Sequence, residues 1–167
     1  MQYKALTANR FSEVSLGTKV DYLDESKWFR EFSFDEIKDI AQFFDVYVVP
    51  PNETLCEEGS SESFLGLIVS GSVGIFKKNA EGAVGKIAEI GSGKVFGEMS
   101  LVDGRPRSAE VKVLQKLEVC VMKKEKFQSL VQVAPALGVK LVLQIAQLIS
   151  ARLRKTSGQL VEHLGSS

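Results

Sequence analysis

The middle of the chain alternates short apolar runs with turn-forming residues. The apolar runs occupy residues 46–49, 64–70, 73–78, 86–90, 109–113 and 117–122. The first four end at prolines or glycines, or at residues 79–82, whose sequence Asn-Ala-Glu-Gly is typical of a hairpin turn. In the last two runs, apolar and polar residues alternate with the period of two of a half-buried strand. This spacing predicts a mainly β fold, an antiparallel jelly-roll barrel rather than a parallel sheet.

Helical patterns flank these strands on both sides. Ser33 and Glu36 match a capping box and precede apolar residues at helical spacing, while residues 27–30 predict a shorter helix. After the strands, residues 124–131 predict a short helix, and Pro135 is suited to the first turn of a long one. We therefore expect N-terminal helices and a long C-terminal helix around the β-barrel.

The long helix carries two apolar stripes. The first stripe consists of Leu137, Leu141, Ile145 and Leu148. The second stripe has the a and d spacing of a coiled coil and consists of Val139, Val142, Ala146, Ile149, Leu153, Thr156 and Leu160. Since one stripe is enough to dock the helix on the β domain, the second predicts a homodimer through this helix. The alternative is a single helix that is buried on two sides.

These patterns divide the chain into three parts. Residues 1–24 form an N-terminal segment without a recognisable element, which we expect to be poorly ordered. Residues 25–134 form the β-barrel with its short helices, and residues 135–164 form the long helix, a dimerisation or relay element. No signal peptide and no membrane span is predicted, so we expect a cytoplasmic protein without a membrane partner.

Charge balance and scarce metal ligands exclude several classes of protein. The 167 residues hold 21 basic and 21 acidic side chains, so the basic excess of a general nucleic-acid binder is missing. One histidine and two cysteines are too few for a multi-ligand metal site, which argues against a cupin-type metalloenzyme. No nucleophile is paired with a base in a recognisable motif. We therefore expect a binding protein without a metal or cofactor, not an enzyme.

The segment from Phe96 to Ala109, FGEMSLVDGRPRSA, carries the candidate chemistry. Arg107 supplies a planar fork of donors that stays charged and suits a phosphate. Glu98 would repel an anion, but its carboxylate suits a sugar hydroxyl. Gly97 lets the backbone come close, and Ser108 adds a hydroxyl donor. The alternative is a surface turn with a Glu–Arg salt bridge. Arg105, the nearby rival to Arg107, lies in the loop before Pro106 and is interpreted as solvated.

This segment resembles the phosphate-binding cassette of the cyclic nucleotide-binding domain family, which reads F-G-E-(L/M)-(A/S)-L, a short loop, then P-R-(A/S/T)-A. Further matching positions are Glu58-Gly59 and Ile68 with Gly71, and the resemblance covers residues 25–160. It implies that Arg107 holds the phosphate and Glu98 the ribose 2′-hydroxyl. The supporting positions that it implies are Gly97, Met99, Ser100 and Ser108.

The base of the nucleotide is less closely specified. In catabolite activator proteins a Thr-Ser pair on the long helix reaches the adenine, and Thr156-Ser157 resembles that pair. This favours cAMP, with cGMP possible. The nearby Arg152, Arg154 and Lys155 are interpreted as a solvated helix end rather than a DNA-binding patch.

Together these features predict a cyclic nucleotide sensor in signal transduction. Ligand binding would reposition the long helix and so control an unidentified effector protein. One alternative is a truncated transcription regulator, since no recognition helix can be placed after Leu164. Another is a degenerate domain kept for dimerisation.

Overall fold

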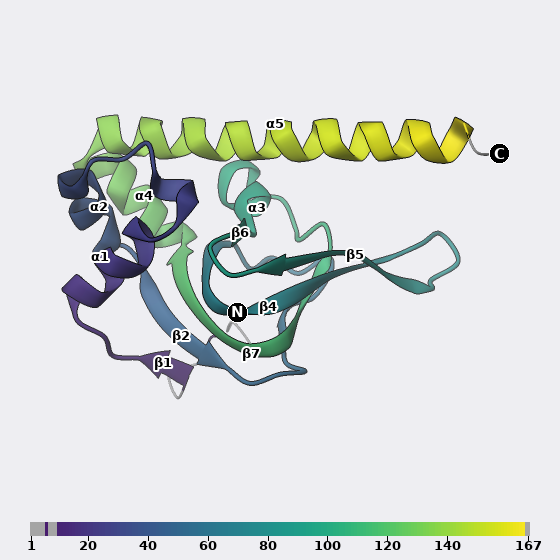
Figure 1. Ribbon diagram of the computed structural model, residues 1–167, viewed down its shortest axis with the longest axis horizontal. Helices are drawn as coiled ribbons and strands as arrows, with labels where there is room; N and C mark the ends of the chain where they lie inside the picture. Colours follow the sequence, from purple (N-terminus) through teal and green to yellow (C-terminus); the bar gives the residue numbers. More distant parts are fainter. Residues whose placement is uncertain (1–5, 7–9, 166–167) are drawn as a thin grey trace.

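An antiparallel sheet forms the body of the molecule in the computed structural model (Figure 1), which describes residue 6 and residues 10–165, with side chains as far as residue 162. Its strands are β1 (Phe11–Ser12), β2 (Asp45–Val49), β3 (Thr54–Cys56), β4 (Phe64–Lys78), β5 (Val84–Gly91), β6 (Val95–Phe96) and β7 (Glu110–Lys123). Their order is β1-β2-β7-β4-β5, with β3 on β7 and β6 on β4. The predicted antiparallel β fold is confirmed. The sheet is curled but not closed, so it is not a complete barrel.

Strands β4 and β7 each join two of the predicted runs into one long strand. The sequence predicted that a strand ends at Gly71, but β4 continues through it while its register with β7 shifts between Ser70 and Ser72. Gly71 has a φ of 87°, and a Cβ on it would lie 2.2 Å from the carbonyl oxygen of Lys116. The glycine therefore bends the strand where β7 crosses closely, instead of ending it.

Short helices cover one end of the sheet. They are α1 (Leu16–Asp24), the 3-10 helix η2 (Lys27–Phe29), α2 (Phe34–Ala41) and α4 (Lys124–Val133). The predicted capping box of α2 is confirmed, because Ser33 N donates to Glu36 Oε2 at 2.7 Å and Glu36 N donates to Ser33 Oγ at 3.3 Å. Helix α1, whose Val20 and Leu23 are buried, corrects the expectation of poor order for residues 16–24. The part of that expectation on residues 1–5 and 7–9 lies outside the described residues.

The long helix α5 (Pro135–Gly165) begins at the proline as predicted and crosses above α3 and the sheet edge (Figure 1). Its first stripe packs on the domain, since Leu141 and Ile145 are fully buried and Leu137 is 8% exposed. Two polar contacts also hold this half: Lys140 Nζ donates to Glu36 Oε2 at 2.6 Å, and Gln144 Nε2 donates to the carbonyl oxygen of Trp28 at 2.7 Å. The N-terminal half of α5 is thus fixed to the short helices.

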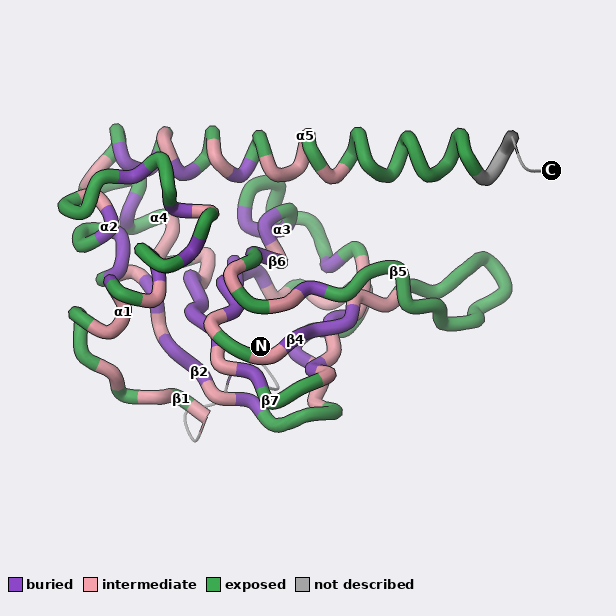
Figure 2. Tube along the Cα trace, in the orientation of Figure 1, coloured by how far each residue is buried: buried purple, intermediate pink, exposed green. Residues whose placement is uncertain are grey.

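After Arg152, helix α5 is exposed as far as residue 162 (Figure 2). Leu153 and Leu160 of the second stripe are 65% and 59% exposed, and Val139 near the start of the helix is 60% exposed. Within Pro135–Glu162, an 18-residue window has a mean hydropathy of 1.4, so by length and composition alone this helix could cross a membrane, contrary to the expectation from the sequence; 22% of the window is buried inside the molecule. The buried part belongs to the first stripe, which packs against protein.

Apolar side chains gather in two core clusters. One lies between the helices and the sheet and includes Cys120, and the other lies within the curl of the sheet and includes Cys56. Burial raises the pKa of the Cys56 thiol to about 11 and that of Cys120 to about 12. Both thiols are therefore protonated near neutral pH, and they behave as small apolar core residues.

Candidate functional site

The segment that carries the sequence motif folds around Gly97. Helix α3 (Glu98–Asp103) starts directly after this glycine, and residues 104–109 lead from it to β7; we call residues 97–108 the cassette. Gly97 has a φ of 79°, and a Cβ on it would lie 2.5 Å from the carbonyl oxygen of Phe64 and 2.7 Å from Arg107 Nη1. Only glycine fits here without displacing β4 or the arginine.

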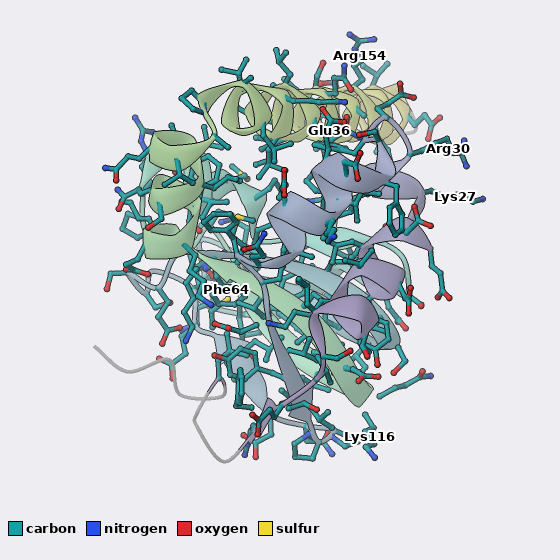
Figure 3. The ribbon with its side chains drawn as sticks, turned by 90° about the vertical axis from the view of Figure 1, so that its left-hand side faces the viewer. Lys27, Arg30, Glu36, Phe64, Lys116 and Arg154 are labelled. Carbon is teal, nitrogen blue, oxygen red and sulfur yellow. The ribbon has the colours of Figure 1, made fainter. Side chains whose placement is uncertain are left out.

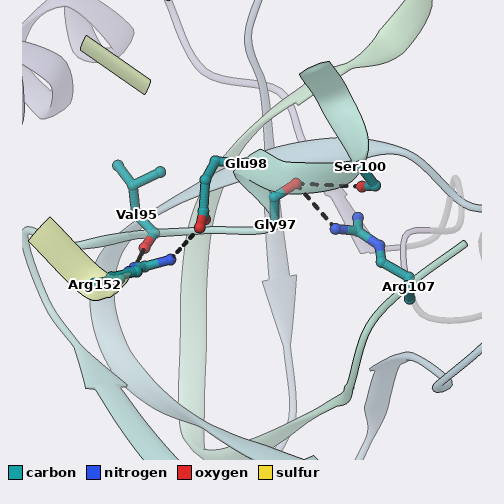
Figure 4. Close-up of polar contacts among 6 residues, drawn as sticks. All are labelled: Val95, Gly97, Glu98, Ser100, Arg107 and Arg152. Carbon is teal, nitrogen blue, oxygen red and sulfur yellow. Dashed lines mark hydrogen bonds and ion pairs between the residues drawn. The ribbon is translucent and has the colours of Figure 1, made fainter. Parts of the chain in front are cut away.

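Arg107 is turned into the protein and is only 6% exposed. Its Nη1 donates to the carbonyl oxygen of Gly97 at 3.0 Å (Figure 4), and its Nη2 donates to that of Phe64 at 3.1 Å. The guanidinium carbon lies 4.2 Å above the centre of the Phe64 ring. The backbone is held as well, because Arg107 N donates to Ser60 O and Gly59 N donates to Arg107 O, both at 2.8 Å. The two carbonyl oxygens and the Phe64 ring therefore fix the position of this buried cation.

Glu98 brings a buried carboxylate to the start of α3. The residue is 2% exposed, and its Oε1 accepts a hydrogen bond from Arg152 Nη1 at 2.5 Å. Among the residues that the structure describes, no donor reaches its Oε2, which is also buried. Leaving a buried carboxylate oxygen unsatisfied costs free energy. A hydroxyl group entering the site would satisfy this oxygen.

Arg152 joins helix α5 to the cassette. Besides the ion pair with Glu98, its Nη2 donates to the carbonyl oxygen of Val95 at 2.5 Å (Figure 4). This corrects the interpretation of Arg152 as part of a solvated helix end, whereas Arg154 and Lys155 are exposed. The signal was available in the sequence: Arg152 continues the first stripe at helical spacing, four residues after Leu148.

Ser100 and Met99 occupy different environments within α3. Ser100 is 3% exposed, and its Oγ donates to the carbonyl oxygen of Gly97 at 3.3 Å. Its own carbonyl oxygen accepts from Ser63 Oγ at 2.7 Å. Ser100 thus connects α3 to Ser63, directly before β4, and to Gly97, while Met99 is 47% exposed at the surface.

The residues around Arg107 in the sequence lie at the surface. Ser108 is exposed, and its carbonyl oxygen accepts from Lys77 Nζ at 2.5 Å. Lys77 also pairs with Glu58 at 3.2 Å, so strand β4 holds the end of the cassette. Arg105 is exposed, in agreement with its interpretation as a solvated residue.

The structure brings Glu98 and Arg107 to either side of Gly97, and Ser100 and Arg107 both donate to the carbonyl oxygen of Gly97 (Figure 4). It does not bring Thr156 and Ser157 into this group. Both are exposed on α5, one helical turn beyond Arg152.

The comparison with protein families agrees with this geometry. The family model of the cyclic nucleotide-binding domain matches residues 47–133, just over half of the chain. The chain belongs to the cyclic nucleotide-binding domain family. The resemblance inferred from the cassette motif is thereby confirmed.

Curated relatives and solved structures are similar to parts of the chain. The cyclic AMP receptor protein of Thermus thermophilus is 27% identical over 81% of this chain and 61% of its own length. The cAMP-activated global transcriptional regulator CRP of Escherichia coli O6:H1 is 33% identical over 67% of this chain and 52% of its own length. The chain thus spans about half to three fifths of these relatives. A cyclic nucleotide-binding domain from Methylobacillus flagellatus KT superposes with a TM-score of 0.78 at 28% identity, over 89% of this chain and 83% of that one.

Proposed function

We propose that the chain is a cytoplasmic cyclic nucleotide sensor, which binds cAMP in preference to cGMP and controls a partner protein without consuming the ligand. The observation that carries this proposal is the pair of buried, oppositely charged groups in the cassette. Arg107 is an inward-facing cation, and Glu98 keeps one carboxylate oxygen that no donor reaches within the described part of the chain. A cyclic nucleotide carries one phosphodiester anion and one ribose hydroxyl, which match these two groups.

Each group has a role set by its chemistry. Arg107 binds the phosphate through charge-assisted hydrogen bonds, which are about twice as strong as neutral ones. Glu98 accepts the ribose 2′-hydroxyl proton on Oε2 and so rejects the deoxy analogue. Gly97 makes room for the backbone to approach the ligand, while Met99, Ser100 and Ser108 complete the cassette around it.

Binding is coupled to α5 through the two oxygens of Glu98. Arg152 occupies Oε1, and the ribose takes Oε2, so the same carboxylate contacts both the ligand and the helix. A ligand shifts a conformational equilibrium only by its difference in affinity for the two states. We propose that the difference in ligand affinity between the two conformations arises at this shared carboxylate, and that α5 is the element that moves. Thr156 and Ser157 would then contact the base in the bound state.

The second stripe of α5 supports a homodimer. Its exposed leucines and valines have coiled-coil spacing, and a second copy of the helix would cover them. Replacing Leu153 by Glu should convert a dimer into a monomer in a sizing experiment, because it places a charge in the seam. Arg154→Glu, next to it but off the stripe, is the matched control. A wild-type monomer at the same concentration would contradict the dimer.

The deciding experiment titrates the purified chain with cAMP and cGMP side by side by calorimetry. We expect saturable binding that is tighter for cAMP, and a raised thermal midpoint, because the ligand binds only the folded state. An unchanged midpoint with millimolar amounts of both nucleotides would favour a degenerate domain kept for dimerisation. The partial coverage of the CRP-type relatives supports a second candidate, the sensor part of a transcription regulator, in which the same site would act.

A further inference from the structure

Phe64 contacts the Arg107 guanidinium in two ways. Its ring lies under the guanidinium, with the cationic carbon 4.2 Å from the ring centre, and its carbonyl oxygen accepts from Nη2 at 3.1 Å. The side chain is fully buried at the first residue of β4, and Figure 3 places it in the interior between the strands. The sequence pattern marked Phe64 only as an apolar strand residue.

An aromatic ring stabilises a cation in a different way than a carboxylate does. The ring face carries negative potential and attracts the guanidinium, most strongly where water is excluded. It contributes no opposite net charge, and so the attraction of Arg107 for an anion is not cancelled. This combination suits a buried cation that must remain attractive to a phosphate.

The contacts also set the direction of the N–H groups. The guanidinium is flat, and the ring below it together with the carbonyl oxygens of Phe64 and Gly97 fixes its plane. The ring is itself held, because Phe96 packs edge-on against it with centroids 6.0 Å apart at 88°. The donors of Arg107 are therefore oriented before a ligand arrives, which reduces the cost of ordering them on binding.

We infer that Phe64 is a positioning residue for ligand binding: its ring holds the Arg107 guanidinium in the orientation that the phosphate needs. This inference rests on the proposed function, because it assigns a support to the phosphate-binding group. It predicts that affinity for a cyclic nucleotide depends on the electrostatic potential of the ring face, and not only on the shape of the side chain.

A series of fluorinated phenylalanines at position 64 tests this dependence. Mono-, di- and trifluorination withdraw negative potential from the ring face while nearly preserving its shape. The dissociation constant of cAMP, measured by calorimetry on the full chain, should rise stepwise, by about tenfold at the most fluorinated ring. Phe64→Leu, which keeps an apolar side chain but removes the ring, should lose a similar factor. The same fluorinated residues at Phe44, fully buried in the other core cluster, serve as the matched control.

The outcomes separate the two proposals. If wild type binds cAMP and the series at position 64 behaves like the series at Phe44, the role of Phe64 is overturned while the proposed function stands. If wild type binds neither cAMP nor cGMP, the proposed function fails. The ring–cation contact is then tested by the free energy of unfolding without ligand. Fluorination at position 64 should lower this free energy more in wild type than in the Arg107→Leu variant. Equal destabilisation of the two would overturn the contact.

Discussion

The cassette and helix α5 each bring an arginine to the same site, and they hold it in opposite ways. Arg107 of the cassette is 6% exposed, lies on an aromatic ring and donates to two backbone carbonyl oxygens. Arg152 of α5 keeps 38% of its side chain exposed and spans from the helix to a carboxylate and one carbonyl oxygen. Arg107 is part of the folded cassette, whereas Arg152 connects α5 to Glu98 of α3 and to Val95 of β6.

This difference assigns the two regions different tasks. The Arg107 side chain cannot move without breaking its contacts within the cassette and with Phe64, and so it is suited to hold a ligand in a fixed position. A long side chain from a helix that is fixed only in its first half can change partners at low cost. We therefore expect substitutions in the cassette to act on affinity, and substitutions on α5 to act mainly on the response to the ligand.

The largest effect is expected for Arg107→Ala. Losing the charge-assisted contacts to the phosphate should weaken cAMP binding about a hundredfold in a calorimetric titration. Arg105→Ala, two residues earlier and exposed, is the control and should bind like wild type. The free energy of unfolding is measured in parallel, because the substitution leaves two buried carbonyl oxygens with one donor fewer. Unchanged affinity in a folded variant would refute the phosphate role.

A smaller and more selective loss is expected for Glu98→Gln. A neutral amide oxygen accepts a weaker hydrogen bond than a carboxylate. The preference for cAMP over its 2′-deoxy analogue should therefore fall about tenfold. Glu81→Gln on the exposed hairpin tip is the control. Equal losses for both ligands would count against a ribose contact.

Arg152→Met should separate binding from response. Glu98 loses the partner that orients it, and we expect affinity to fall about fivefold, less than for either cassette variant. Ligand-dependent changes in hydrogen exchange of residues 153–162 should disappear. Arg154→Met, exposed on the same helix, should keep both properties. A ligand response as large as that of wild type would show that α5 is coupled to the cassette by another route.

The smallest effect concerns the fixed half of α5. The hydrogen bond from Lys140 holds the pKa of the Glu36 carboxyl below its usual range. A carboxyl group whose pKa is lower in the folded state contributes stability above its usual pKa, and this contribution is lost as the pH falls through the folded value. Both side chains are about one third exposed, so solvent screens the pair.

Glu36→Gln should accordingly lower the free energy of unfolding by about 0.5 kcal/mol at neutral pH. The difference from wild type should shrink below about pH 4, where the wild-type carboxyl becomes protonated. Glutamine preserves the capping box with Ser33, so the variant isolates the ion pair. Chemical denaturation at both pH values measures this, with the exposed Glu31→Gln as control. A difference that is independent of pH would argue against the ion pair.

Local features of the site and fold were readable from the sequence, because neighbouring residues determine them. The capping box of α2 and the start of α5 at Pro135 depend on contacts within a few residues, and the cassette around Gly97 is a contiguous motif that resembles a known family. Arg152 and Phe64 were missed because their contacts cross the fold. Arg152 meets Glu98 across 54 positions, and Phe64 meets Arg107 across 43. Periodicity places Arg152 on the stripe that faces the domain, but it does not report which residue of another element either side chain meets, because that depends on how the sheet and the helix dock.

The end predicted for a strand at Gly71 was wrong because it, too, depends on a contact between distant segments. Gly71 was interpreted as the end of a strand, because glycine is typical of turns. Its place in the middle of β4 depends on the close crossing of β7, a contact between distant segments. The dimer contact of the second stripe of α5 stays a prediction, since the described residues of this chain leave much of the stripe exposed.

The site tolerates almost no substitution at Gly97. One added methyl group would collide with the β4 backbone and with the guanidinium at once. A descendant with alanine at this position could therefore lose its messenger while Glu98 and Arg107 were still present in the sequence. Counting those two charged residues is not enough to tell a working receptor from a scaffold in this lineage.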